Sequence, residues 1–341
     1  MQQLQVGRTV RERMTQQHRG AGRQTPANRS HLTPVDPLED VLRLLRPKGG
    51  ISARLVAGGD WAVRFDAPPH VKFNAVTQGS CLLTVDGIDR PVTVEEGDCY
   101  LLTRPHPYVL SSGQGVDPVD ADAVFTQPTP TAAFAQVGSR RDCTIVGGAF
   151  SFLGRSRSLL LDQLPPLIHV PATSEHSVGI NEALAWISRE AHRGELGRGL
   201  VVNHLAVLML VHVLRHHVRT DRHKDGWLAG SADPVVGPVL RALHGNPAHP
   251  WTIREVAATA GVSRSTLAAR FKNVVGTSPL DYLTAWRIEL ASNHLVEGRD
   301  TVSAIASAVG YSSESTLSIA FKRIVGLSPG AYRKIYTATS T

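Results

Sequence analysis

Charged side chains occur at matching places in two stretches near the end of the chain, and their chemistry suits a nucleic acid. Arg264 and Lys272 are eight residues apart in the first stretch, as are Glu314 and Lys322 in the second. A guanidinium can form two hydrogen bonds to guanine, a carboxylate can accept one from cytosine, and an ammonium group suits phosphate. Each of these residues taken alone is equally consistent with a solvated surface charge, so the elements that position them decide between the two interpretations.

The two stretches are copies of one pattern. The first reads TIREVAATAGVSRSTLAARFKNVVGTSPLDYL from Thr252, and the second reads TVSAIASAVGYSSESTLSIAFKRIVGLSPGAYR from Thr301. Each copy predicts a helix, a turn at Gly261 or Gly310, and a second helix, because glycine adopts the left-handed backbone without penalty. This is the helix-turn-helix arrangement, whose second helix enters the major groove of DNA.

Apolar spacing orients each second helix. The residues expected to face inward are Leu267, Phe271 and Val274 in the first copy and Leu317, Phe321 and Ile324 in the second. The residues left facing outward, toward DNA, are Arg264, Ser265, Ala268, Ala269 and Lys272, and Glu314, Ser315, Ser318, Ile319 and Lys322. Of these, Arg264 alone can bond guanine with two hydrogen bonds, and Lys272, Lys322 and Arg287 suit phosphate.

The segment between the copies predicts a rigid spacer. Ser278-Pro279 and Ser328-Pro329 are typical cap and first-turn pairs, each opening a further helix. The first of these helices would run from Pro279 to about Glu297 and measure about 28 Å. Such a spacer could hold two recognition helices in successive major grooves, roughly 34 Å apart.

The C-terminal stretch resembles the AraC/XylS family of bacterial transcription regulators. The resemblance is carried by ATAGVSRSTLAARFKNVVGTSP, by IASAVGYSSESTLSIAFKRIVGLSPGAYR and by Trp286-Arg287, and covers about residues 234–341. It implies sequence-specific binding to double-stranded promoter DNA, usually as a homodimer, with RNA polymerase as the eventual partner. Relatives read bases at the positions of Ser265, Ala268, Ala269, Ser315, Ser318 and Ile319. This sequence departs from many relatives in having short or apolar residues there.

Charge separates the chain into three parts. Residues 1–34 carry a net charge of +5, residues 35–231 a net charge of −2, and residues 232–341 a net charge of +4, within a total of +7. The basic ends favour a polyanionic partner. Residues 1–34 lack apolar periodicity, which predicts a disordered basic arm; a true start near Met14 is an equal alternative. The sequence contains neither a secretory signal nor eighteen consecutive apolar residues, which favours a cytoplasmic protein without a membrane span.

Residues 35–172 predict a small antiparallel barrel. A short helix over 37–45 precedes strands expected at 54–57, 61–65, 71–77, 81–85, 91–94, 99–103, 108–111 and 144–150, separated by glycine-bearing turns. The order from Phe73 to Gly79, then Gly97-Asp98 and LLTRPHP, resembles a cupin barrel of the kind fused to AraC-type DNA-binding domains. The resemblance implies that the barrel receives an unidentified small-molecule effector or another signal, and we assign a candidate pocket to His70, Phe73, Tyr100 and His106.

An enzyme is the first alternative, and the sequence argues against it. Cupin enzymes hold a metal through an H-x-H pair, a glutamate and a later histidine. Here Val71 and Lys72 follow His70, and only His106 is a further candidate ligand, so we expect no catalytic residue, no metal and no cofactor. A barrel that only dimerises the protein is the second alternative.

Cys81, Cys99 and Cys143 leave a thiol-based redox sensor as a third alternative. None of them shows C-x-x-C spacing, and Cys81 and Cys99 fall in strands that could be neighbours. The DCTIVGGAF segment around Cys143 is similar to oxidant-sensing relatives. A buried structural role is the default for a strand cysteine.

Two helices are expected at 178–192 and 200–218. The second is apolar, with a polar stripe through His204, His212, Arg215, His216 and Arg219 that we interpret as a solvated face. The predicted organisation is an α+β multidomain chain. It comprises the arm (1–34), the cupin-like sensor (35–172), a helical dimerisation segment (173–220), a linker (221–233) and a helical DNA-binding domain (234–341) with helix-turn-helix units at 252–275 and 301–325.

Overall fold

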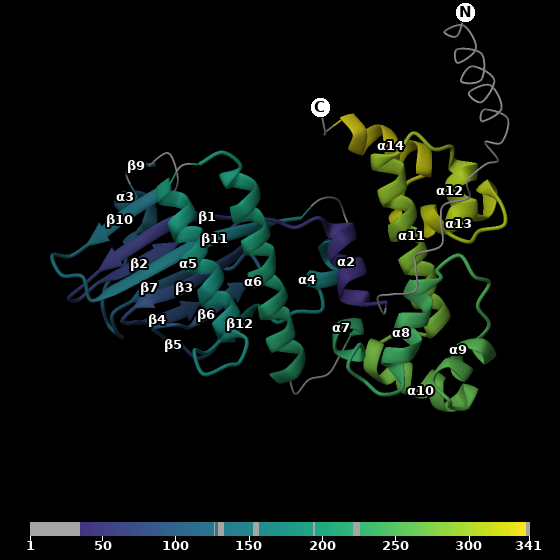
Figure 1. Cartoon of the computed structure of the whole chain (residues 1–341), viewed down its shortest axis with the longest axis horizontal. Coiled ribbons are helices and arrows are strands. Elements are labelled where there is room, and N and C mark those ends of the chain that lie inside the picture. Colours follow the sequence, from purple (N-terminus) through teal and green to yellow (C-terminus); the bar gives the residue numbers. More distant parts are fainter. Residues whose placement is uncertain are drawn as a thin grey trace, which may run out of the picture. The chain divides into compact units, whose positions relative to one another are not determined.

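A computed structural model describes residues 35–338 except for 126, 129–132, 153–156, 194 and 221–225. The predicted basic arm, 1–34, lies outside the described residues. From Asp36 onward the chain forms one unit by its contacts. It contains a β-rich part and helices of 4 to 23 residues (Figure 1).

The β-rich part consists of two sheets. One has the strand order β12-β6-β3-β11-β1-β10-β9, and the other has the order β5-β4-β7-β2-β8. The strands are β1 Lys48–Ala57, β2 Ala62–Phe65, β3 Val71–Gln78, β4 Ser80–Val85, β5 Val92–Glu95, β6 Cys99–Leu102, β7 Tyr108–Ser111, β8 Val119–Asp120, β9 Gln127–Pro128, β10 Ala133–Val137, β11 Cys143–Ser151 and β12 Leu167–Val170. All eight expected strands are present, and β8, β9, β10 and β12 were missed.

The space between the sheets is filled by side chains. Along β4, alternate residues are buried, which places Cys81, Leu83 and Val85 on one face. They pack with Tyr100 and Tyr108 in a core that contains residues of both sheets. These side chains fill the space between the sheets, so the β-rich part is a cupin-like sandwich. The β-rich cupin character was predicted, but the strands form two separate sheets in place of an antiparallel barrel, and β1 with β10 and β2 with β8 pair in parallel.

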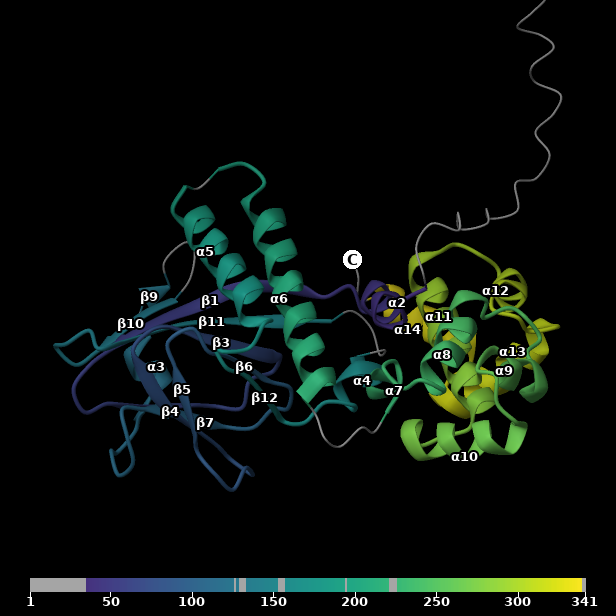
Figure 2. The ribbon, with the colours of Figure 1, turned by 60° about the horizontal axis from the view of Figure 1, so that its bottom comes forward.

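Two helices cover the outer face of the seven-stranded sheet (Figure 2). They are α5 Ser177–Arg193 and α6 Arg198–Thr220. The backbone of β1 comes close to α6 at Gly49, whose N–H donates to Asn203 Oδ1 at 2.9 Å. A Cβ on Gly49 would lie 2.6 Å from the Ala206 Cβ, so this contact needs glycine. Among the described helices, α6 is the one long and apolar enough to cross a membrane by length and composition, a test that core helices also pass.

The remaining helices are α2 Pro37–Leu45, α3 Ala121–Val124, α4 Arg157–Leu161, α7 Trp227–Gly230, α8 Val236–Gly245, α9 Ile253–Thr259, α10 Arg264–Val275, α11 Pro279–Glu297, α12 Val302–Ala308, α13 Glu314–Val325 and α14 Pro329–Ala338. The helices predicted at 37–45 and 279–297 have the bounds expected. Helix α11 contributes Leu283 and Trp286 to one core and Ile288 and Leu295 to another. It is therefore shared by both halves of the helical region.

The linker differs from the expectation of a polar connection. Residues 221–225 lie outside the described part of the chain, but Trp227 and Leu228 are buried in α7. The Trp227 indole N–H donates to the Leu159 carbonyl at 2.7 Å. The polar composition of DRHKDGWLAGSADP concealed this short helix, because only two of its residues are large and apolar.

Candidate nucleic-acid interface

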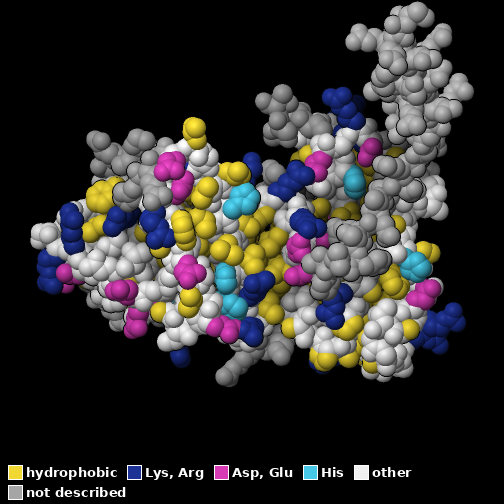
Figure 3. Space-filling model, in the orientation of Figure 1, with side chains coloured by type: hydrophobic (Ala, Val, Ile, Leu, Met, Phe, Trp, Pro, Cys, Tyr) yellow, Lys and Arg dark blue, Asp and Glu magenta, His cyan; other side chains and the backbone are white. Residues whose placement is uncertain are grey.

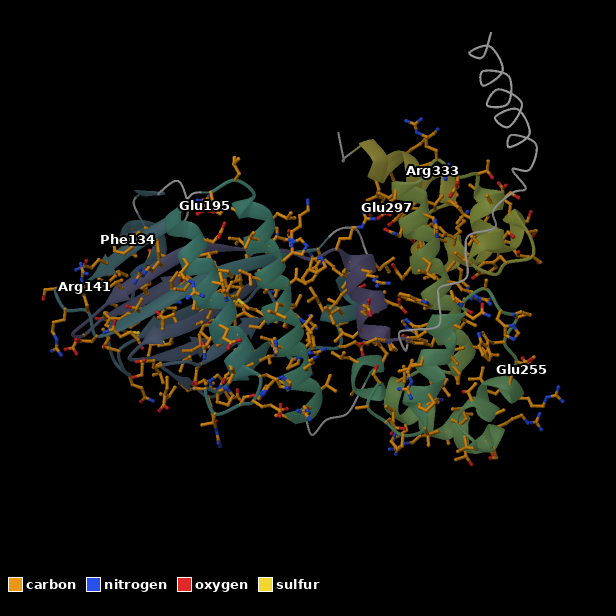
Figure 4. The ribbon with its side chains drawn as sticks, in the orientation of Figure 1. Phe134, Arg141, Glu195, Glu255, Glu297 and Arg333 are labelled. Atoms are coloured by element: carbon orange, nitrogen blue, oxygen red, sulfur yellow. The ribbon has the colours of Figure 1, made fainter. Side chains whose placement is uncertain are left out.

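The first helix-turn-helix is built by capping and a glycine turn. Helix α9 begins with a capping box between Thr252 and Glu255, the residue labelled in Figure 4. The turn contains Gly261 at φ 66°, as predicted. Ser263 then caps α10 by accepting from the Thr266 N–H at 3.1 Å. These local hydrogen bonds fix where the recognition helix starts and how it is oriented.

The predicted outward face of α10 is exposed. Leu267 and Phe271 are fully buried and Val274 is 5% exposed, which anchors the opposite side of the helix. Every residue predicted to face outward is exposed: Arg264, Ser265, Ala268, Ala269 and Lys272. The structure does not test whether they contact bases, so these roles remain predictions.

The second unit repeats this construction with different side chains. Thr301 caps α12, Gly310 has φ 87°, and Ser313 and Thr316 form a capping box at the start of α13. Leu317 and Phe321 are buried, whereas Ile324 is only partly buried.

The outward residues of α13 are Glu314, Ser315, Ser318, Ile319 and Lys322, and all except the partly buried Ser318 are exposed. Ile319 is 72% exposed and places a large apolar side chain on this outward face. A thymine methyl group would provide an apolar contact for it.

Arg287 differs from the expectation of a free phosphate-binding side chain. Its guanidinium donates from Nε to the Pro247 carbonyl and from Nη2 to the His249 carbonyl, both at 2.7 Å. Burial lowers the pKa of Arg287. We therefore assign it a positioning role, in which it holds the loop before α9 against α11.

Two further arginines make contacts with residues far along the chain, and sequence reasoning missed both. Arg270 pairs with Asp233 at 2.6 Å. Burial disfavours the charged form of Asp233, but hydrogen bonds from the Val236 N–H and from Arg270 outweigh it and lower its pKa. Arg333, labelled in Figure 4, donates to the Leu295 and Asp300 carbonyls at the end of α11. No spacing in the sequence indicates pairs so far apart along the chain.

The candidate effector residues do not form a pocket together. His70 is exposed in the turn before β3, and His106 lies in the loop after β6, near Gly87. Phe73 packs against Phe150 on the helix-covered side of the sheet. Tyr100 instead lies between the sheets, with its hydroxyl accepting from Asn74 at 2.8 Å. The proposed grouping is wrong because neighbouring strands place these side chains on opposite faces.

The cysteines pair differently from the expectation. Cys81 on β4 and Cys99 on β6 belong to different sheets, and their side chains lie in different cores. The Cys81 thiol instead donates a hydrogen bond to the Cys143 sulfur, which raises the pKa of Cys81 and, against the effect of burial, lowers that of Cys143. Burial raises the pKa of Cys99 to about 12.

The polar stripe of α6 is only partly a solvated face: His204, Arg215 and Arg219 are exposed as predicted, but His212 and His216 are packed against other residues. His216 is 8% exposed and its Nδ1 lies 2.9 Å from the Ser174 hydroxyl. His212 lies against Gly179, where a Cβ would come within 2.5 Å of its ring, and against the ring of His176. Burial is the main cause of the lowered pKa values of all three histidines. Within the described residues, no group of three or more histidines, cysteines or acids is arranged to hold a metal.

Comparisons with known proteins agree with this architecture. The family profile described as Cupin matches residues 36–219, and the one described as Helix-turn-helix domain matches residues 256–335. An AraC-like transcription regulator of Streptomyces lividans is 54% identical over 301 residues, which cover 88% of this chain and 98% of the relative.

A more distant relative also aligns over most of both chains. An RCS-specific helix-turn-helix-type transcriptional activator of Escherichia coli is 27% identical over 305 residues, 88% of this chain and 98% of the relative. Among solved structures, the DNA-binding domain of AdpA in complex with a target DNA is 32% identical, covers 32% of this chain and 96% of that chain, and has a TM-score of 0.30.

Fold and site together define a helix-turn-helix DNA-binding protein with a cupin domain. The chain belongs to the AraC family of transcription regulators. It is a regulator and not an enzyme, since its relatives are transcription regulators.

Proposed function

We propose that this regulator acts in the cytoplasm as a homodimer, binds promoter DNA through α10 and α13 of each subunit, and contacts RNA polymerase there. The observation that carries the proposal is the pair of exposed recognition faces on capped helices that share the continuous helix α11. Arg264 would read guanine, Glu314 would accept from cytosine, and Lys272 and Lys322 would hold phosphates.

Mapping of bound sites across the genome, followed by footprinting of the purified protein on them, tests this proposal. We expect each subunit to protect two major-groove segments about 34 Å apart on one side of the duplex. A single protected segment, or equal binding to all sequences, would refute the two-helix arrangement. The genes beside the bound sites would also suggest the effector.

An apolar surface on α5 and α6 supports the homodimer. Its residues, all large and between 41% and 66% exposed, are Val178, Trp186, Leu200, Val201 and Leu208. Figure 3 shows hydrophobic side chains gathered over these two helices. Contiguous exposed apolar surface of this kind marks protein interaction sites, and a second copy of the same helices would offer a matching surface.

A thiol switch is a second candidate for the signal, and the contact between Cys81 and Cys143 favours it. Cys143 accepts the hydrogen bond that stabilises its thiolate, and Cys81 is the adjacent thiol. With hypochlorous acid as oxidant, the two thiols would lose two electrons and two protons to give one disulfide, while the oxidant is reduced to chloride and water. The disulfide would link β4 to β11, and so one sheet to the other.

Mass spectrometry of alkylated, digested protein after hypochlorous acid treatment tests this candidate. We expect a peptide pair joined through Cys81 and Cys143 in the wild type and in Cys99→Ser, and none in Cys143→Ser. If the wild type shows no such pair although the same treatment oxidises a thiol peptide added to the sample, the cysteines are structural.

A further inference from the structure

Three histidine rings meet where the beginning of α5 lies beside α6. The ring of His176, just before α5, has its centroid 5.7 Å from that of His212 and 6.4 Å from that of His216. The His176 side chain is 13% exposed, and His216 is 8% exposed. Gly179 in α5 lies against the His212 ring, where a Cβ would come within 2.5 Å. The three rings therefore form part of the contact between the beginning of α5 and α6.

This cluster suits rings that carry no charge. His176 Nε2 and His212 Nδ1 are buried and have no hydrogen-bond partner among the described residues. Glu175 Oε1 lies 3.4 Å from His176 Nε2 but forms no hydrogen bond with it, and the same carboxylate pairs with Arg219. A neutral imidazole can leave one nitrogen without a proton, whereas a protonated imidazole has two N–H donors. Protonation of His176 or His212 would therefore bury a positive charge and a donor with no hydrogen-bond acceptor in place, which is costly.

Neighbouring charges do not favour protonation either. The charged and titratable groups that face the rings, within the described part of β12, the loop before α5, α5 and α6, are His169 with its partner Asp98, Glu175, Glu182, Arg215, His217 and Arg219. The two glutamates in this set are matched by two arginines. Burial is the largest cause of the lowered pKa of each ring, and an arginine or other histidines lower it further. Glu182 opposes this effect on the pKa of His212, and a hydrogen bond with the His169 backbone opposes it for His216.

We propose that the cluster of His176, His212 and His216 is an acid-sensitive contact, which holds the beginning of α5 against α6 at neutral pH and releases it on acidification. Released rings would titrate around the ordinary histidine pKa of 6.5, whereas burial gives the packed rings lower pKa values. Above about pH 6.5 both forms are neutral and the contact has its full strength. Below that pH the released form binds protons that the packed form does not, so the packing is lost as the pH falls. Such a switch lies within the cupin domain and does not depend on the proposed function.

Hydrogen exchange measured by mass spectrometry on the full chain without DNA, at about pH 7.5 and about pH 5.5, tests this switch. Protection factors, which correct for the effect of pH on the intrinsic exchange rate, are compared for peptides covering residues 180–187 of α5. We expect protection in these peptides to fall at least about tenfold at the lower pH, because each ring that gains a proton only when released multiplies the opening equilibrium. Peptides from α10, which contains no histidine, should keep their protection.

Three variants identify the groups that titrate. His212→Gln and His176→Gln each remove one titrating ring and keep a polar side chain, so each should reduce the fall in protection by at least about twofold. His204→Gln is the matched control, because it removes an exposed histidine of the same helix and should leave the fall unchanged. Each protein is compared with itself at two pH values, so a constant loss of stability in a variant cancels.

The wild type alone can overturn the proposal, whether or not the variants fold. Protection over residues 180–187 that is the same at both pH values would do so, as would an equal fall in the α10 peptides, which indicates global acid unfolding. A fall of wild-type size in both His212→Gln and His176→Gln would assign the titration to other groups.

Discussion

Arg264 and Lys322 lie on the exposed faces of the two recognition helices but are expected to make different contacts with DNA. A guanidinium that bonds one guanine twice distinguishes base pairs, whereas an ammonium group on a phosphate binds any sequence. Arg264→Ala should therefore cost about 1–3 kcal/mol on the true operator and barely change binding to scrambled DNA. Lys322→Ala should weaken binding to both duplexes by similar factors.

A salt series on the two duplexes separates these roles. For Lys322→Ala, the slope of log K against log salt should become shallower by about one, because one fewer counterion is released. If Arg264→Ala weakens both duplexes equally, Arg264 is a phosphate contact. The first unit would then read DNA only through methyl contacts and DNA shape.

The sequence predicts which residues of α10 and α13 are buried and which are exposed, because this pattern depends only on spacing along one helix. Leu267, Phe271 and Leu317 are all buried as expected. The contacts of Arg287 with the carbonyls of Pro247 and His249 could not be predicted, because they depend on how a distant loop folds back. The thiol contact of Cys81 with Cys143 was missed for the same reason, since it joins strands of two different sheets.

At the scale of the element, the two glycine turns have the same conformation in different surroundings. Gly261 and Gly310 both have positive φ, but a Cβ on Gly261 would meet open space. A Cβ on Gly310 would come within 2.7 Å of the backbone of Ala248. The second turn thus requires glycine for its close approach to Ala248 as well as for its backbone conformation.

Paired alanine variants measure this difference. Gly261→Ala should destabilise the protein by about 1–2 kcal/mol, the cost of a left-handed residue with a Cβ. Gly310→Ala should cost more, since the loop containing Ala248 must also move, and it should weaken operator binding as well. Thermal unfolding and operator titration of both variants provide the comparison. Equal melting temperatures for the two variants would show that the contact at Ala248 has no energetic weight.

Helices α5 and α6 show what sequence periodicity can predict and what it cannot. Both helices were predicted, with ends one or two residues short of the observed bounds. Two residues of the polar stripe, His212 and His216, were misjudged because the ring of His176, just before α5, packs against both of theirs. Polar residues predict solvent exposure only when no neighbouring element brings them a partner.

At the scale of the whole molecule, the apolar surface on α5 and α6 predicts the oligomeric state. Leu208 is 43% exposed in α6, and a charge there would be buried without a partner in a dimer. Leu208→Glu should therefore weaken self-association by at least about tenfold in sedimentation equilibrium. Affinity for a duplex carrying two operator copies should fall with it, since two linked subunits bind more tightly than one.

Phe134→Glu is the matched control, because Phe134 is also 43% exposed but lies on β10 (Figure 4). This variant should keep the wild-type oligomeric state. A Leu208→Glu protein that still sediments as a dimer would place the interface elsewhere.

The repeat in the helical region has a further consequence, which follows from its unequal side chains. Both recognition helices have the same backbone plan, yet one presents Arg264 with two alanines and the other presents Glu314 with Ile319. Turning the protein end for end on its site would place each helix against the wrong bases. A bound subunit would therefore have a single orientation on its operator. The orientation of the operator within a promoter would then set the direction in which the bound regulator faces.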